Sequence, residues 1–432
     1  MFLGDVLILV ITFVVLLLLG VPISFSIGLS TIATMLMSID TLPSLTTVSQ
    51  QMATGLDSFA LLAIPFFILA GQLMNHGGIA RRLIDAAKVV VGGLPGGLSY
   101  VIIIASMLFG AISGSAVAAA AAIGGFMIPL MVNEGYERNF SAAVNITAST
   151  TGLIIPPSNI LIVYAFASGG ASVAALFLAG YLPGLIIGLS LMAVAGTYSY
   201  FKKFPTGERV GLKESAKRFL DAIPSIFMVI LVIGGIVAGY FTATEASAIA
   251  VAYAFILAGP AYREVKMKDL PRILLDTANT TAIVMLLIGT SIAMSWVMSY
   301  ENIPQNVSQF LVGLTDSKIV ILLIINVLLL FVGTFMDMTP AVLIFTPIFL
   351  PVVEQLGMHP VHFGIMMVTN LCVGLCTPPV GSVLFVGTGI AETTIAKVVK
   401  PLLPLYIAMF IGLLLVTYVP FFSLWLPSLF GY

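Results

Sequence analysis

Two proline pairs stand inside apolar stretches that would otherwise read as continuous helices. The first lies in IIPPSN (154–159) and the second in CTPPVG (376–381). A proline has no N–H to donate to the carbonyl four residues back, and its ring crowds that carbonyl, so a helix opens there. Each pair is therefore expected to leave two carbonyls without a helical partner: those of Gly152 and Leu153, and those of Gly374 and Leu375.

These carbonyls matter because the composition is that of a membrane protein. Of the 432 residues, 60% are hydrophobic and 8% are charged, whereas a soluble domain carries about 25% charged residues. An all-α polytopic membrane protein is predicted. Inside a bilayer, a bare carbonyl is tolerated only where it faces protein or a water-filled cavity. The hypothesis that follows is that the carbonyls at the proline pairs bind ions.

Apolar stretches long enough to cross about 30 Å of hydrocarbon recur at 3–19, 22–39, 58–76, 172–201, 222–241, 243–259, 276–299 and 401–422. Two longer, interrupted regions cover 95–168 and 318–390. Amphipathic segments at 77–93 and 301–314 are typical of helices that lie along the interface. The N-terminal run has no preceding Lys or Arg and carries Asp5, so we interpret it as a span and not as a cleaved signal peptide.

Basic residues predict the orientation of these spans, because Lys and Arg gather on the cytoplasmic side. One topology leaves only Lys318, of 17 Lys and Arg, on the outer side. In it the N-terminus is outside, residues 95–134 form a re-entrant hairpin that opens inside, and residues 318–355 form one that opens outside. Treating either region as an ordinary crossing would scatter the basic residues over both faces.

The two hairpins belong to an internal repeat. Residues 108–157 align with 330–379 at a constant offset of 222, without a gap. Apolar matches are common in such a composition, but three prolines and two glycines also coincide: Pro129, Gly135, Gly152 and Pro156–Pro157 pair with Pro351, Gly357, Gly374 and Pro378–Pro379. An odd number of crossings separates the copies, which predicts two inverted-topology repeats, an arrangement common in secondary transporters.

In each copy a hairpin tip precedes the Pro-broken helix, GAISGSAVA (110–118) in the first and GTFMDMTPA (333–341) in the second. Glycine and hydroxyl clusters suit a turn that faces a ligand, and the helix that follows begins with partial positive charge. We predict two cation sites that flank one anion site between the tips. Hard, mostly neutral oxygen ligands favour Na+. The alternative is that the proline pairs are only kinks and the tips only small-residue helix contacts.

The first cation site is assigned to Ser113, Ser115, Gly152, Ile155 and Pro157. The second is assigned to Gly333, Thr334, Asp337, Thr339, Gly374 and Thr377. The anion between the tips is assigned to Gly114, Ser158, Asn159, Met338, Gly381 and Ser382. Because intramembrane carboxylates are costly and usually functional, Asp337 is interpreted as a cation ligand or proton carrier. The alternative is a water-exposed acid on the outer side of the hairpin.

The remaining reactive side chains receive structural interpretations. Glu245 is interpreted as a hydrogen-bond acceptor between helices, and Cys372 and Cys376 as small apolar residues instead of a disulfide or metal pair. No Lys or Arg falls in either tip or broken helix. An anion must then be held by helix N-termini, hydroxyls and bound cations, which makes the binding of anion and cation interdependent. No cofactor is predicted, and Na+ is the coupling ion.

Several motifs together resemble a known family: PFFILAGQLMNHGGIARRLID (65–85), GAISGSAVAAAAAIGGFMIPLM (110–131), GYERNFSAAV with IIPPSN (135–159), TATEASAIAVAYA (242–254) and CTPPVG (376–381). They resemble the large membrane subunit of tripartite ATP-independent periplasmic (TRAP) transporters, over essentially the whole chain. The resemblance implies an elevator mechanism, in which a transport domain carries a small organic acid with Na+ past a scaffold. It also implies a small four-helix membrane subunit, a periplasmic substrate-binding protein and a bacterial inner membrane with a periplasmic N-terminus.

The predicted layout places scaffold helices at 1–76 and 222–299, interfacial arm helices at 77–93 and 300–317, transport-domain segments at 94–168 and 318–390, a connecting span at 169–201, a cytoplasmic basic loop at 202–221 and a C-terminal span at 391–432. Family substrates include C4-dicarboxylates, sialic acids and keto acids, and selectivity is expected to rest largely with the binding protein.

Three other functions are alternatives to uptake through a tripartite system. The nearest is a self-sufficient Na+/carboxylate carrier or antiporter of the same superfamily. An intramembrane enzyme is disfavoured because the sequence has no HExxH or GxSxG, and because His76, His359 and His362 lie near span ends, where an interfacial placement is expected. A channel is disfavoured because two tips near the midplane suit an occluded site better than a continuous pore.

Overall fold

The computed structural model describes residues 2–206, 211–315 and 317–432. Within these ranges the regular elements are helices, apart from one isolated bridge between Pro95 and Thr206. Nine helical segments of this part of the chain are long and apolar enough to cross a membrane, which confirms the all-α membrane fold. Arg209, one of the basic residues counted in the 202–221 loop, lies outside the described residues.

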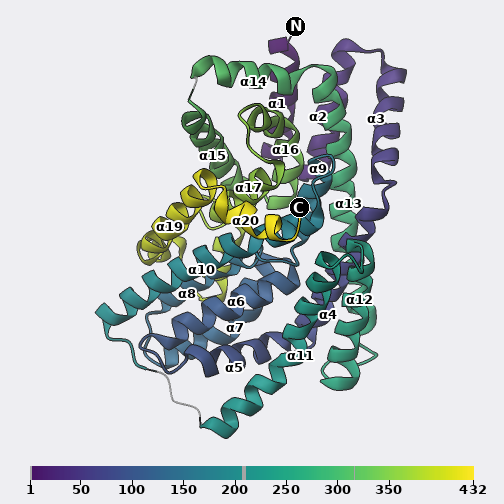
Figure 1. Cartoon of the computed structure of the whole chain (residues 1–432). Coiled ribbons are helices and arrows are strands. Elements are labelled where there is room, and N and C mark those ends of the chain that lie inside the picture. The colour runs from purple at the N-terminus through teal and green to yellow at the C-terminus, as the bar shows by residue number, and fades with distance from the viewer. Residues whose placement is uncertain (1, 207–210, 316) are drawn as a thin grey trace.

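One group of helices stands together along one side of the molecule (Figure 1). Its members are α1 (Phe2–Leu18), α2 (Ile23–Ser38), α3 (Thr41–Leu56), α4 (Ala63–His76), α11 (Leu212–Val237), α12 (Ala243–Ile256) and α13 (Leu270–Tyr300), with short turns η1 (Phe59–Leu62) and η2 (Leu257–Ala261). Helix α4 packs on α12, and α13 packs on α2, α3 and α4. These helices occupy the segments predicted to form the scaffold, except that α11 begins at Leu212, inside the segment 202–221 that was predicted as a loop.

The second group contains both hairpins and both broken helices. Its first half comprises α6 (Gly97–Ser113), α7 (Ala116–Asn133), α8 (Arg138–Thr151), α9 (Asn159–Ala167) and α10 (Val173–Lys202). Its second half comprises α15 (Lys318–Phe335), α16 (Met338–Gln355), α17 (Pro360–Gly374), α18 (Ser382–Ile390), α19 (Ile395–Tyr418) and α20 (Phe421–Leu429). Helix α10 packs against α6, α19 and α20.

The second arm of each hairpin packs on its own half and also on the other half. Helix α7 of the first hairpin contacts α18, beyond the second proline pair, and α16 of the second hairpin contacts α9, beyond the first pair. The first arms stay in their own half, where α6 packs on α8 and α15 packs on α17. These contacts between the two halves bring the two tips and the two helix breaks into one region.

Two further helices lie at opposite ends of the molecule: α5 (Ile79–Val91) and α14 (Ile303–Leu314) (Figure 1). Helix α5 buries its apolar face, including Ile79, Leu83 and Ile84, against α6 and α11 and keeps Arg81 exposed. Both segments were predicted as amphipathic helices, and placement at opposite ends is what two inverted copies would produce.

Two helices differ from the sequence prediction. Helix α3 was not expected, because its sequence is polar for a membrane protein; it buries Ser44 and Val48 beside α13 and exposes most other side chains. The last apolar stretch was expected to run through 401–422, but α19 begins at Ile395 and ends at Tyr418. Pro420 has no N–H to donate to a carbonyl of α19, so that helix ends before it, and Pro420 is the N-cap residue of α20.

Candidate functional site

The first hairpin tip is a two-residue turn between α6 and α7. Gly114 has φ 64°, a left-handed conformation that glycine adopts without strain. Ser115 is the N-cap of α7, and its hydroxyl accepts a hydrogen bond from the Ala118 N–H at 3.2 Å. The Ser113 hydroxyl lies 3.5 Å from the Ser115 nitrogen. The tip is therefore held by its own hydroxyls, and it carries no charge.

The second tip has the same helix boundaries at an offset of 222 but a different turn. Met336 is extended where the first tip has a left-handed glycine. Asp337 occupies the N-cap position of α16 without a side-chain capping bond. The Thr334 carbonyl accepts a hydrogen bond from the Gly381 N–H at 3.0 Å, which ties this tip to its helix break. The second tip thus presents a carboxylate that the hairpin itself does not use for capping.

Each first arm crosses its broken helix at a pair of glycines. A Cβ added at Gly152 would lie 2.6 Å from the Gly110 Cα, and one added at Gly374 would lie 2.7 Å from the Gly333 Cα. Backbones approach this closely only without side chains. Three of these glycines had been assigned as cation ligands, and the structure gives Gly152, Gly333 and Gly374 a packing role as well.

The helix breaks free fewer carbonyls than predicted. At the first, the Leu153 carbonyl accepts the Ser158 hydroxyl at 2.5 Å, and among the described residues none donates to the Gly152 carbonyl. At the second, the Gly374 carbonyl accepts the Thr377 N–H at 2.9 Å, and within the described chain no donor reaches the Leu375 carbonyl. The expectation that both carbonyls of each predicted pair are open is therefore wrong: among the described residues, one of the two is open at each break.

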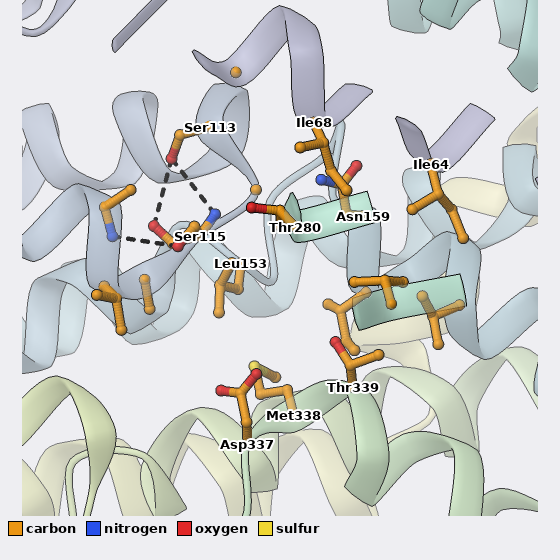
Figure 2. Close-up of a pocket in the computed structure, with 18 of the residues that line it drawn as sticks. Ile64, Ile68, Ser113, Ser115, Leu153, Asn159, Thr280, Asp337, Met338 and Thr339 are labelled. Carbon is orange, nitrogen blue, oxygen red and sulfur yellow. Dashed lines mark hydrogen bonds between the residues drawn. The ribbon is translucent and has the colours of Figure 1, made fainter. Parts of the chain in front are cut away.

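Both tips and both breaks line one cavity of about 290 Å³. Figure 2 shows Ser115 and Leu153 on one side and Asp337, Met338 and Thr339 on the opposite side. The Asp337 side chain is exposed to this space. Of the predicted site residues, those that line it are Ser113, Gly114, Ser115, Asn159, Asp337, Met338, Thr339 and Ser382.

The other predicted site residues do not line the cavity. They are Gly152, Ile155, Pro157, Ser158, Gly333, Thr334, Gly374, Thr377 and Gly381, which are absent from the lining. The breaks reach the cavity instead through Leu153 and Leu375. The predicted residues therefore form two groups. Side chains of the tips line the cavity, whereas the glycines of the breaks pack against the hairpin arms.

Two scaffold helices complete the cavity, and the sequence did not predict them. Helix α4 contributes Gln72 and Asn75, and α13 contributes Thr280. Helix α4 also touches the first tip, because a Cβ at Gly71 would lie 2.9 Å from the Ser113 carbonyl oxygen. The available signal was the two neutral amides in the apolar run PFFILAGQLMN (65–75), three residues apart and hence on one helix face.

The structure also bears on the interpretations of Glu245, the two cysteines and His362, which lie away from the cavity. Glu245 is structural, as predicted, but it serves its own helix: it forms a capping box with Thr242, whose N–H donates to the Glu245 carboxylate at 2.8 Å. Cys372 and Cys376 are buried free thiols, as expected of small apolar residues. His362, near the start of α17, is buried, and its Nε2 lies 2.7 Å from the Val416 carbonyl.

One basic residue does belong to a broken helix. Arg138 is the first residue of α8, far along the helix from the break, and its guanidinium donates to the Ala391 carbonyl at 3.1 Å. Beside it, Lys202 lies 2.8 Å from the Glu137 carboxylate. This hydrogen bond holds the pKa of Glu137 below its usual range. These charges join helix ends and do not approach the cavity lining.

The chain matches a family model along nearly its whole length. The model, described as the tripartite ATP-independent periplasmic transporter, DctM component, covers residues 10–422. The Salmonella typhimurium protein YgiK is 54% identical over 420 residues, which are 97% of this chain and 96% of that one. The Rhodobacter capsulatus protein named C4-dicarboxylate TRAP transporter large permease protein DctM is 41% identical over 433 residues, 97% of this chain and 98% of that one.

A solved structure shows the same kind of fold. Neisseria gonorrhoeae MtrF, described as illuminating a class of antimetabolite efflux pumps, superposes with a TM-score of 0.64 at 13% identity, covering 87% of this chain and 84% of its own. At this identity the likeness concerns the arrangement of helices alone.

Proposed function

The chain belongs to the DctM family of tripartite ATP-independent periplasmic transporters, and on that premise we propose that it imports a small organic anion together with Na+. It is a large membrane subunit of this transporter class and not an enzyme, since its relatives are named as permeases. The finer proposal concerns the coupling ion, the site and the motion. The observation that carries it is the single cavity on which both tips and both breaks converge.

Two Na+ ions would bind where a tip meets a break. In the first half the oxygen donors are the Ser113 and Ser115 hydroxyls with the open Gly152 carbonyl behind them. In the second half they are the Asp337 carboxylate and Thr339, with Leu375 supplying the open carbonyl in place of Gly374. Neutral hydroxyls, carbonyls and one carboxylate are the hard donors that suit a singly charged ion.

Substrate binding would depend on these ions. Of the residues that the structure describes, none of those lining the cavity is Lys or Arg, so a substrate carboxylate gains its positive partner from bound Na+ and from the helix N-termini of α7 and α16. The ions in turn gain a negative partner from the substrate. Each Na+ that moves inward down about 100 mV then contributes about 2.3 kcal/mol before its concentration gradient is counted.

The position of the cavity between two groups of helices supports an elevator motion. Its walls come from the hairpin group and from α4 and α13 of the scaffold group. We infer that the hairpin group slides past α4 with its cargo. The close approach of Gly71 to the Ser113 carbonyl is then a sliding contact, which a small residue permits.

In the full system, a small four-helix membrane subunit would hold the scaffold and a periplasmic binding protein would deliver the acid. We place the chain in a bacterial inner membrane with its N-terminus in the periplasm. The binding protein would set much of the selectivity, and the cavity would set the rest.

Reconstitution tests this proposal. The chain is placed in proteoliposomes with its small subunit and its binding protein, and uptake of the acid that the binding protein retains is followed with and without an inward Na+ gradient. Uptake that requires all three proteins and the gradient is expected. Equal uptake by this chain alone would show a self-sufficient carrier, and uptake indifferent to Na+ would contradict the coupling.

A further inference from the structure

A second cavity, of about 220 Å³, lies apart from the one between the tips. It is formed where α15, α17, α19 and α20 meet, and none of its lining residues also lines the first cavity. Lys318, the first residue of α15, stands at the end of the molecule where α14 lies (Figure 1). In the orientation proposed above, this end faces the periplasm. The second cavity therefore belongs to the outer surface of the membrane.

This cavity gathers cationic and imidazole groups. Lys318 is the one Lys or Arg that the proposed topology leaves on the outer side, and two of the three histidines of the chain, His359 and His362, line the same cavity. Of the lining residues that the structure describes, none is acidic. None of the ion pairs between described residues involves Lys318. A lysine on a face that otherwise lacks basic residues indicates a local anionic partner.

The backbone adds positive charge at the same place. The lining contains the first residue of α15, Lys318, and the N-cap residues of α17 and α20, which are His359 and Pro420. A helix N-terminus carries partial positive charge and favours an anion. Three such termini around one cavity, with a lysine among them, favour a ligand with a negatively charged group.

The exposed histidine is a donor toward this ligand. The Val361 N–H donates a hydrogen bond to Nδ1 of His359 at 3.2 Å. Nδ1 is therefore unprotonated, and the proton of the neutral ring is on Nε2. Because His359 is exposed beside the cavity, its Nε2–H is available to an oxygen of the ligand.

The buried histidine offers the opposite group. Pro420 has no N–H to donate to the Val416 carbonyl four residues back, and Nε2 of His362 lies 2.7 Å from this carbonyl. A carbonyl only accepts, so Nε2 carries the proton and Nδ1 is an acceptor in the neutral ring. The side chain is only 3% exposed, and no described residue donates to Nδ1. An unpaired acceptor in a buried ring favours a ligand that supplies a donor.

The ligand must therefore combine two kinds of group. Lys318, the His359 Nε2–H and the helix N-termini favour an anion with several acceptor oxygens, such as a phosphate. Nδ1 of His362 favours a hydroxyl. An ammonium group would also donate, but the charge of Lys318 and the helix N-termini would repel it. A phosphodiester that carries a hydroxylated headgroup satisfies all of these groups.

The surroundings of the cavity indicate that this phosphodiester belongs to a lipid. Exposed apolar side chains continue from the cavity along α15 at every fourth residue: Ile319, Leu323, Val327, Phe331 and Phe335. Residues four apart lie on one face of a helix, so they form a continuous apolar track for an acyl chain. Tyr418 in the lining and the exposed Trp425 on α20 are of the types that occupy the membrane interface.

The size of the cavity agrees with a headgroup. Its volume of about 220 Å³ is below the range of about 300–1,000 Å³ for sites that enclose a whole small molecule. A lipid would place only its headgroup there and leave its acyl chains on the apolar track of α15.

From these observations we propose that the second cavity binds the headgroup of an anionic phospholipid with headgroup hydroxyls, such as phosphatidylglycerol, from the outer leaflet. Lys318 and His359 bind the phosphate, and Nδ1 of His362 accepts a hydrogen bond from a headgroup hydroxyl. Of the function proposed above, this inference uses only the orientation, because the site is separate from the cavity between the tips.

The test measures lipid binding to the full chain, purified with any membrane subunit that remains bound and freed of co-purified lipid by detergent exchange. Native mass spectrometry gives the affinity for the first added lipid. Three lipids with identical acyl chains are compared: phosphatidylglycerol, phosphatidylmethanol, which has the same charge but no hydroxyl, and phosphatidylethanolamine, which carries an ammonium group. Phosphatidylglycerol is expected to bind about fivefold more tightly than phosphatidylmethanol, the effect of one net hydrogen bond, and also more tightly than phosphatidylethanolamine.

Variants locate the binding. Lys318→Met is expected to weaken phosphatidylglycerol binding about fivefold, the contribution of one lysine near an anionic lipid, and Lys318→Arg should keep the parent affinity. His359→Asn retains a favoured N-cap residue and removes the Nε2–H, so it should weaken binding to a similar extent. Lys397→Met, an exposed lysine in the first turn of α19 and outside the lining, is the matched control and should behave as the parent chain.

Soluble probes distinguish a lipid from a free phosphate. Glycerol 3-phosphate and inorganic phosphate, each added at the concentration of the lipid, are expected to leave phosphatidylglycerol bound. Displacement by either probe at that concentration would show a site for a soluble phosphate and overturn the lipid assignment.

The other outcomes are equally decisive. Equal affinity for the three lipids overturns the headgroup assignment and makes Lys318 a lysine that only extends to the interface. Unchanged phosphatidylglycerol affinity in both Lys318→Met and His359→Asn overturns the cavity as the site. If Lys318→Met lowers the affinity for the periplasmic binding protein and leaves lipid binding unchanged, the cavity is a protein contact and the lipid proposal fails. Each of these results leaves Na+-coupled uptake to its own test.

Discussion

The two tip-and-break units share a frame but differ in what they offer to an ion. In both, a hairpin arm crosses a broken helix at a glycine pair. The first unit is neutral, with Pro156 and Pro157 buried and Ser115 at its tip. The second carries Asp337 and leaves Pro379 exposed. The two units therefore share a backbone arrangement but differ in charge, so the two proposed sites should differ in their affinity for Na+.

The carbonyls at the breaks show how one side chain creates such a difference. Ser158 occupies the Leu153 carbonyl with its hydroxyl. The residue at the same place in the second unit is Val380, which has no donor, and the equivalent Leu375 carbonyl stays open within the described chain. This position therefore decides whether the Leu153 or Leu375 carbonyl is available to a cation, whereas the Gly374 carbonyl is closed by the Thr377 N–H.

The largest effect is expected where the two units are alike. Gly152→Val and Gly374→Val each drive a side chain into the backbone of the facing glycine. Overpacking of this kind costs about 1–3 kcal/mol, and displacing a ligand-binding group by about 1 Å can reduce turnover about 100-fold. Na+-dependent uptake in proteoliposomes should fall by that order in both variants.

The control for this pair is Gly125→Val in α7, where an added Cβ meets no atom within 4 Å. It should retain uptake. If the Gly152 and Gly374 variants transport like the control, the glycine crossings do not set the geometry of the site. The backbone arrangement that the two units share is then not needed for transport.

The next effect should distinguish the units. Asp337→Asn removes the single charge of the cavity lining while keeping the shape of the side chain. A cation about 4 Å from a carboxylate gains about 4 kcal/mol at an effective dielectric constant near 20, and exposure to the cavity reduces this. The Na+ concentration for half-maximal uptake should rise more than about tenfold. A proton carrier would instead show an altered pH profile at unchanged Na+ affinity.

The sequence predicts those features of the two units that residues impose on their own helix, and it does not predict features that depend on packing between helices. Both hairpins and both helix breaks were predicted, because prolines act on their own helix. The alignment nevertheless paired Gly110 with Val332, whereas the structure crosses the second break at Gly333. The close crossing requires a residue without a side chain, so Gly333 takes this place and not the aligned Val332. This requirement comes from tertiary contacts, which the alignment does not contain.

The cavity was predictable only in part for the same reason. Tip residues such as Ser115 and Asp337 are flagged by local motifs, but Gln72 and Asn75 reach the site through the packing of α4 against the hairpins, which no local pattern records. The open carbonyls were overcounted because a neighbouring hydroxyl or turn N–H can satisfy them. Such bonds depend on the backbone conformation after the break.

A smaller effect is expected at the neutral tip. Ser115→Ala removes the hydroxyl that accepts the Ala118 N–H and that is proposed to bind the first Na+. An N-cap of this type is worth about 1 kcal/mol, so half-saturation by Na+ should rise about fivefold, clearly less than for Asp337→Asn. Titration of uptake against NaCl measures both. A larger effect at Ser115 than at Asp337 would reverse the proposed order of the two sites.

The smallest effect comes from making the second break resemble the first. Val380→Ser supplies a hydroxyl where Ser158 stands in the first unit, and it is expected to bond the Leu375 carbonyl and draw it away from Na+. A net hydrogen bond is worth about 0.5–1.5 kcal/mol, and at this exposed position competition from water keeps it at about 0.5 kcal/mol, so Na+ half-saturation should rise about twofold. Val380→Thr, which keeps the branched shape and adds the same hydroxyl, should give the same rise, and Val380→Ala should give none. Because Val380 is exposed, none of the three changes disturbs packing. Equal behaviour of the serine and alanine variants would show that the Leu375 carbonyl is not a ligand, and the distinction drawn between the two breaks would then rest on Asp337 alone.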